Sequence, residues 1–127
     1  MDPITVTTDE VMTTLRAVVA ERPEYVYRKP SDVDNTWDAC LYVHPAGGGR
    51  EEEAPGCVVG TVLHRLGVPL AELAMREGTA AYSVVHELLD VPDEAQAALQ
   101  YAQTQQDGGS TWSRALQAAE ERVVAEI

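Results

Sequence analysis

The sequence predicts an α+β fold that is mostly helical, with a small antiparallel β-hairpin packed on a bundle of five to six helices. Apolar residues recur at helical spacing in several segments, and two short β-branched or aromatic runs precede most of them. Gly and Pro residues mark most boundaries between these segments. The length fits a single domain, residues 1–127, because single cores typically span roughly 100–150 residues.

The central element is expected over residues 55–67, which contain the longest apolar run of the chain. Its apolar positions recur at i, i+3, i+4 and i+7, the spacing that lines one face of a helix. These positions hold Val59, Val62, Leu63 and Leu66. Pro and Gly residues stand at both ends of the segment, where they favour the start and the stop of a helix. We therefore expect a buried helix here.

One further helix and the hairpin are expected before this segment. Residues 8–22 carry an apolar stripe at helical spacing, with Thr8 or Asp9 as the helix cap. Residues 25–27 and 41–43 are short runs of β-branched and aromatic side chains, each followed by turn formers. They are predicted to pair as antiparallel strands.

Two loops are expected around these strands. Residues 29–38 are rich in Pro, Ser, Asp and Asn, which is typical of a surface loop, and Trp37 is expected to turn back over the edge of the core. The run of Gly and Glu at 47–53 predicts a mobile linker between the hairpin and the helical part.

Four helices are expected after residue 67. A short helix opens at Pro69, and a second is capped by Thr79 and has Tyr82 on its apolar face. A third begins at Pro92 and carries a stripe of small residues, so it is expected to pack closely against the last helix as a helical hairpin. The last helix, capped by Ser110 or Thr111, has an apolar stripe of Trp112, Ala115, Leu116, Ala119 and Val123.

The formal net charge of −12, from 21 acidic and 9 basic residues, limits the partners of the chain. Nucleic-acid backbones require a positive stripe, and the basic residues are scattered, so direct nucleic-acid binding is not expected. An acidic surface also repels anionic membranes and is attracted to basic protein surfaces. No apolar run approaches the roughly 20 residues of a bilayer span, and no basic or apolar leader opens the chain, so we expect a cytoplasmic protein with reduced cysteines.

Cys57 is the residue of the central helix with the most direct chemical potential. In the first helical turn its thiol would lie near unpaired N–H groups and the positive end of the dipole, which favour a thiolate. His64 lies two turns further along, roughly 10 Å away on the axis, and is too distant to act as its base. No catalytic residue is therefore assigned, and Cys57 is kept as a candidate nucleophile beside the alternative of a small buried packing residue.

The candidate binding residues are Cys57, Gly60, His64, Trp37 and Trp112. Gly60 stands mid-helix, where glycine costs about 1 kcal/mol relative to alanine, so something should require its missing side chain. A close helix crossing against the small residues of 95–102 is one explanation, and the approach of a small molecule beside Cys57 is the other.

The sequence supports neither a zinc site nor a DNA-binding helix-turn-helix. Cys40, His44, Cys57 and His64 lack the tightly spaced pairs of structural zinc ligands, so neither a metal nor a cofactor is expected. Residues 73–84 match part of a helix-turn-helix, but residues 79–90, where the recognition helix would lie, contain no basic residue unless His86 is counted. A recognition helix needs such residues, so DNA binding does not follow from this match.

Four stretches in this order resemble small uncharacterised acidic proteins of actinobacteria and their phages. They are Cys-Leu-Tyr-Val-His (40–44), Pro-Gly-Cys-Val-Val-Gly (55–60), Leu-Gly-Val-Pro-Leu (66–70) and Gln-Asp-Gly-Gly-Ser-Thr-Trp-Ser-Arg-Ala-Leu (106–116). The resemblance implies no activity for single residues. It implies a context in which phage-encoded acidic accessory proteins bind or inhibit a host protein.

The sequence thus predicts a non-catalytic cytoplasmic protein-binding module whose partner has a basic surface. The alternative is an enzyme or small-ligand-binding protein with a pocket at the helix N-terminus around Cys57. The last helix adds a second expectation, because its stripe extends from Trp112 to Ile127 and exceeds what the short preceding helices readily cover. Either the stripe pairs with its copy in a homodimer or it closes the core.

Overall fold

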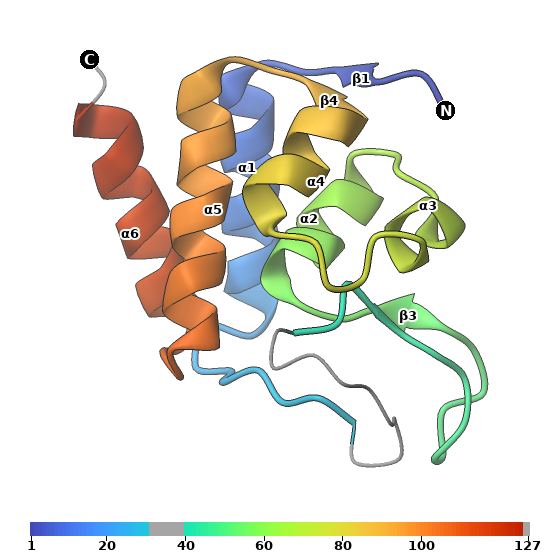
Figure 1. The fold of residues 1–127 in the computed structure, drawn as a ribbon. Coiled ribbons are helices and arrows are strands. Elements are labelled where there is room, and N and C mark those ends of the chain that lie inside the picture. Colours follow the sequence, from blue (N-terminus) through green and yellow to red (C-terminus); the bar gives the residue numbers. More distant parts are fainter. Residues whose placement is uncertain (31–39, 126–127) are drawn as a thin grey trace.

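Six helices enclose one core in the computed structural model, which describes residues 1–30 and 40–125. The helices are α1 (Thr8–Glu21), α2 (Val58–Arg65), α3 (Leu70–Ala74), α4 (Ala81–Leu88), α5 (Asp93–Asp107) and α6 (Trp112–Ala125). The strands are β1 (Ile4–Thr5), β2 (Val43–His44), β3 (Ala54–Pro55) and β4 (Leu89–Asp90). Figure 1 shows the two small sheets on different sides of the helices. The mostly helical α+β class predicted from the sequence is confirmed.

Helix α2 lies inside the core, as its apolar run predicts. All residues from 58 to 63 are buried, and α2 packs against α1 on one side and α5 on another. The helix begins at Val58, three residues after Pro55, because the backbone N–H groups of residues 56 and 57 bond to the neighbouring sheet. The Gly56 N–H donates to the Tyr42 carbonyl oxygen and the Cys57 N–H to the Leu41 carbonyl oxygen, both at 2.9 Å, so this stretch extends the neighbouring sheet before the helix starts.

The predicted first helix is confirmed as α1, with its cap one residue earlier than expected. The Thr7 hydroxyl accepts from the Glu10 N–H, and the Glu10 carboxylate accepts from the Thr7 N–H, both at 3.1 Å. This reciprocal pair satisfies two backbone donors, which a cap at Thr8 or Asp9 would not achieve.

The predicted pairing of residues 25–27 with 41–43 is wrong. Val43 and His44 of β2 pair antiparallel with β3, whereas Val26 forms an isolated bridge with Thr111 beside α6. The Gly residues at 47–49 explain the difference, because all three have positive φ and close the turn between β2 and β3. This segment is the turn of the hairpin and not the predicted linker.

The parallel pair of β1 and β4 is absent from the predictions. Ile4 lies opposite Leu89 and Thr5 opposite Asp90, and Val6 N–H donates to the Asp90 carbonyl at 3.1 Å. Each strand has two residues, which is too short for a periodic pattern to be recognised in sequence. The pairing ties the N-terminal segment to the junction between α4 and α5.

The predicted hairpin of the last two helices is confirmed, since α5 packs along α6. Ala115, Ala119 and Trp112 of the α6 stripe are buried, while Leu116 and Val123 are partly buried against the same core. The described part of this stripe is thus mostly covered within one chain, and Ile127 lies outside the described residues. The homodimer stays a prediction.

Helix α4 departs from the prediction at its start. Its N-cap is Ala80 and not Thr79, and no side chain bonds to the cap. Its buried face is formed by Ala81, Val84, Val85 and Leu88, whereas Tyr82 is 43% exposed. Tyr82 lies outside the arc of these positions around the helix, and its N–H donates to the Gln100 amide oxygen at 2.7 Å.

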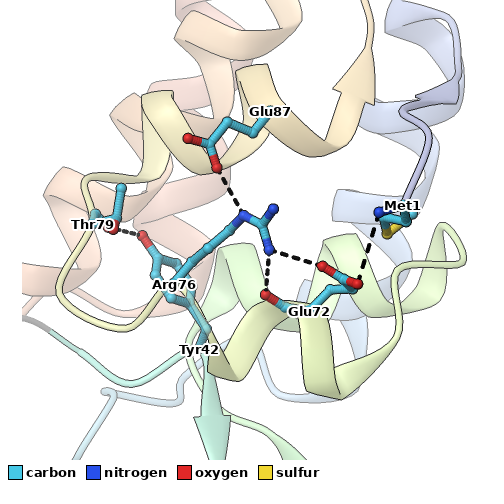
Figure 2. Close-up of polar contacts among 6 residues, drawn as sticks. All are labelled: Met1, Tyr42, Glu72, Arg76, Thr79 and Glu87. Carbon is cyan, nitrogen blue, oxygen red and sulfur yellow. Dashed lines mark hydrogen bonds and ion pairs between the residues drawn. The ribbon is translucent and has the colours of Figure 1, made fainter.

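Arg76 joins α3 to α4 (Figure 2). Its Nε donates to the Glu87 carboxylate at 2.8 Å, and its Nη1 donates to both the carbonyl and the carboxylate of Glu72, at 2.7 and 3.1 Å. The N-terminal amine of Met1 lies 3.9 Å from the same Glu72 carboxylate. One guanidinium therefore holds two short helices together close to the start of the chain.

The absence of a side chain at Gly60 lets α2 lie close to the hairpin. A Cβ at Gly60 would overlap the Tyr42 carbonyl oxygen and lie 3.0 Å from the Tyr42 Cα, so the close contact is with backbone and not with the small residues of α5. We expect Gly60→Ala to lower the free energy of unfolding by about 1–3 kcal/mol, although alanine is the better helix former.

Gly108→Ala is the matched control for this substitution. A Cβ there meets only ordinary contacts at 3.5 Å, and φ is −78°, so the variant should be neutral or slightly stabilising. Urea unfolding of both variants measures the difference. Equal stability of the two variants would show that Gly60 has no packing role.

Candidate functional site

The start of α2 is surrounded by buried polar side chains from α5 and α6. Gln106 Oε1 accepts two hydrogen bonds, from the Val58 N–H at 2.8 Å and from the Trp112 indole Nε1 at 3.2 Å. Its Nε2 donates to the Asp107 carboxylate at 3.0 Å. Gln106 thereby connects the N-terminus of α2 to the first residue of α6.

Gln103 and Cys57 satisfy the next backbone donors of α2. The Val59 N–H donates to Gln103 Oε1, and the Gly60 N–H donates to the Cys57 Sγ, each at 3.4 Å. The Cys57 N–H itself donates to the Leu41 carbonyl. A helix start normally leaves four N–H groups without a partner, and here every one of them is bonded within the protein.

This arrangement has a direct consequence for ligand binding. Free N–H groups make a helix N-terminus attractive to anions, but those of α2 are already occupied by Gln106, Gln103, Cys57 and Leu41. An anionic ligand would have to displace two buried amide side chains. The N-terminus of α2 therefore serves to join α2 to α5 and α6.

The two thiols of the chain lie next to each other, beside the start of α2. Cys40 and Cys57 are free and buried, and the Gln103 amide nitrogen contacts the Cys40 Sγ. The pKa of Cys40 is raised above the usual range of a thiol. The larger cause is a hydrogen bond with the Cys57 thiol, and the second cause is burial. Such a thiol has little thiolate at neutral pH, and the thiolate is the nucleophilic form.

Two shallow depressions flank Cys40. One, about 190 Å³ in volume, is lined by Tyr27, Lys29, Cys40 and the end of α5, and the other, about 310 Å³, by residues at the start of α4 and by Cys40. Cys57 lines neither of them, and its side chain is fully buried. Small molecules in these depressions would therefore meet Cys40 before Cys57.

The structure brings only part of the predicted binding set together. Cys57 and Trp112 both belong to the polar cluster at the start of α2, and Gly60 lies against the backbone of Tyr42. His64 is exposed at the other end of α2, where its Nδ1 lies 3.0 Å from the Val68 carbonyl oxygen. Trp37 falls outside the described residues.

The two glutamines that organise this cluster, Gln103 and Gln106, are not among the residues predicted from the sequence. Both are buried on α5, and Gln106 continues the stripe of Ala95, Leu99 and Ala102 by one more turn. A polar residue that continues an apolar stripe at helical spacing was the available signal. Tyr27 was missed as well, and its hydroxyl accepts the Leu41 N–H at 3.0 Å and lies 2.8 Å from the His44 Nε2.

The four residues considered as zinc ligands are not gathered in one place. His44 bonds to Tyr27, and His64 lies at the C-terminal end of α2, away from the thiols. Across the described ranges, no group of three or more His, Cys, Asp or Glu side chains is placed to hold a metal ion. In the same part of the chain, no helix has the length and apolar character needed to cross a bilayer.

Comparison with known proteins assigns no family and no function to the chain. No protein-family model, curated protein or solved structure matches the chain. Functional interpretation therefore depends on the chemistry of the described residues.

Replacement of Gln106 by leucine should show how much free energy is lost when the buried start of α2 lacks its acceptor. Gln106→Leu keeps the approximate volume but leaves the Val58 and Trp112 donors without an acceptor, and an unsatisfied buried donor costs about 1–3 kcal/mol. We expect a clear loss of stability in urea unfolding. The control is Gln117→Leu on the exposed face of α6, which should change stability by no more than about 0.5 kcal/mol. Equal effects of the two substitutions would contradict this role of Gln106.

The native thiols should alkylate slowly. We expect iodoacetamide to react with the folded chain more slowly than with free cysteine at pH 7, because both thiols are buried and the pKa of Cys40 is raised. Since the pKa shift is upward, the rate at Cys40 should also fail to rise near pH 8.5, where free thiols become about half ionised.

The control is the same chain in denaturing urea, where both thiols should react fully. Cys40→Ser and Cys57→Ser assign the sites by mass spectrometry. Rapid alkylation of one thiol in the folded chain would favour the alternative of a reactive pocket.

Proposed function

We propose that the chain is a non-catalytic cytoplasmic module that binds a protein with a basic surface. In the context implied by the sequence resemblance, it is a phage-encoded accessory protein that binds or inhibits a host protein. The observation that carries this proposal is the contrast between the arginines, most of which make contacts within the chain, and the 21 acidic residues, many of which are exposed.

Six of the eight arginines make intramolecular contacts with acids, carbonyl groups or aromatic rings, whereas the exposed Arg28 and Arg114 have no such side-chain contact among the interactions of the described residues. The pairs include Arg16 with Glu120, Arg65 with Glu21, Arg76 with Glu72 and Glu87, Arg50 with the Pro45 carbonyl, and Arg22 over the rings of Tyr25 and Trp112. Each such contact removes a positive group from the set available to an acidic partner.

The carboxylates are distributed differently. Glu51, Glu52 and Glu53 are exposed in the loop between β2 and β3, and Asp90 and Asp93 are exposed around the start of α5. With a net charge of −12, such a surface attracts basic proteins over distances of about 10 Å at ordinary salt. Electrostatic attraction of this kind mainly raises the association rate and selects against acidic partners.

The alternative of a catalytic or ligand-binding pocket at Cys57 has less support. It requires an accessible thiol and free N–H groups at the start of α2. Cys57 is fully buried, and the N–H groups of Val58, Val59 and Gly60 donate to side chains of the protein itself. An acidic binding surface requires no rearrangement of this core.

Capture from an actinobacterial lysate tests the proposal. We expect the immobilised chain to retain one partner saturably at about 50 mM salt and to release it progressively as ionic strength rises, because salt screens exposed charges. Replacement of Glu51, Glu52 and Glu53 together by glutamine should weaken the retention, since three negative charges are lost.

The matched control carries three exposed, uncharged substitutions, Thr13→Ala, Ser83→Ala and Ser113→Ala, and should retain the partner like the unaltered chain. Absence of any saturable partner at low salt would refute the proposal. Retention that does not change with salt would refute its electrostatic basis.

A further inference from the structure

A depression of about 450 Å³ lies where the N-terminal segment meets the junction of α4, β4 and α5. Thr5, His86, Asp90, Asp93 and Gln96 supply its polar lining. The parallel pairing of β1 with β4 creates it, because that pairing sets Thr5 opposite Asp90 at the start of α5. It is separate from the cluster around Cys57 and shares no residue with the two depressions at Cys40.

Gln96 in this lining has an unused hydrogen-bond acceptor. The residue is only 4% exposed, and its Nε2 donates to the Val91 carbonyl at 3.4 Å, which identifies the opposite atom of the amide as the oxygen. Among the described residues, nothing donates to that buried Oε1. Buried acceptors normally have a partner, so this oxygen requires a donor that the described residues do not supply.

The charges around Gln96 indicate the chemistry of that donor. Asp90 and Asp93 are exposed carboxylates, and no described Lys or Arg lines the depression. Among the described residues, the Asp90 carboxylate accepts one long hydrogen bond, from the Thr5 hydroxyl at 3.4 Å. The start of α5 carries the positive end of its dipole, but Asp93 in the first turn offsets it. Two carboxylates and a neutral acceptor together favour a cation with several N–H donors.

We propose that this depression binds the guanidinium group of an arginine on the partner protein. Guanidinium presents five N–H donors in one plane, so it can pair with a carboxylate along one edge and still offer a donor to Gln96 Oε1 when that buried side chain turns toward the depression. An ammonium group has three donors around a single point and matches such spread acceptors less well. This inference rests on the proposed function, because it assigns one recognition site to the basic surface of the partner.

The test is an NMR titration of the isotope-labelled full chain with small probes. The probes are N-acetyl-arginine-N-methylamide, its citrulline analogue, which has nearly the same shape without charge, and the corresponding lysine derivative. We expect saturable shifts of the Gln96 side-chain amide and of the backbone amides of residues 89–96 with the arginine probe. The citrulline probe should cause none, and the lysine probe should bind at least about fivefold more weakly.

Variants separate the roles of the lining residues. Gln96→Met and the double change Asp90→Asn with Asp93→Asn should each weaken arginine binding at least about tenfold, a loss of the size expected for an acceptor of a charged donor. Asp9→Asn together with Glu24→Gln removes the same charge from other exposed positions and should change the affinity by less than about twofold. If Gln96→Met does not fold, the two surface aspartates still test the site, because both are exposed.

Three results would overturn the inference. They are equal binding of the arginine and citrulline probes, shifts that map outside residues 89–96, and tighter binding of free arginine than of the blocked probe, which would indicate a small-molecule site. Failure of the arginine site can be distinguished from failure of the proposed binding function. A saturable, salt-sensitive partner whose capture is unchanged by Asp90→Asn with Asp93→Asn would leave the binding module in place and remove only this site.

Discussion

The structure depends on how the buried start of α2 satisfies its backbone donors. Burial of a helix N-terminus costs free energy unless each free N–H finds an acceptor. A buried carboxylate would satisfy the donors at a high desolvation cost, whereas the neutral amides of Gln103 and Gln106 do so without a charge. Because both amides belong to α5, the position of α2 relative to α5 is set by directional hydrogen bonds as well as by apolar contact.

Other parts of the molecule are attached to this arrangement. The same Gln106 oxygen holds the Trp112 indole, which places the first turn of α6, and Trp112 also meets the ring of Tyr25 edge-on at 4.9 Å. On the opposite side, the backbone of Cys57 and the missing side chain of Gly60 allow α2 to lie directly against residues 41 and 42. The hairpin, α2 and the α5–α6 pair therefore meet at one end of α2.

This interior leaves the surface as the part of the molecule available for interaction. The thiols and the helix N-terminus, which suggested a chemical function, are engaged in holding the fold. Carboxylates remain exposed, and the depression at Gln96 combines two of them with a buried oxygen that lacks a donor. Both the exposed carboxylates and this depression have a chemistry that suits basic protein groups; we propose the depression as a specific site, whereas the exposed carboxylates are a general property of the surface.

The sequence by itself determined the helices, because their signals are local: the apolar spacing of 55–67, the stripe of α5 and the Gly residues after Asp107 all act within a few residues. It also determined the acidic character of the surface. The strand partners, the contact of Gly60 with Tyr42 and the bonding of Gln103 and Gln106 were decided only by the tertiary structure. Those features join residues ten or more positions apart. Neither a glutamine on an apolar stripe nor a two-residue strand indicates in sequence which distant backbone group it will meet.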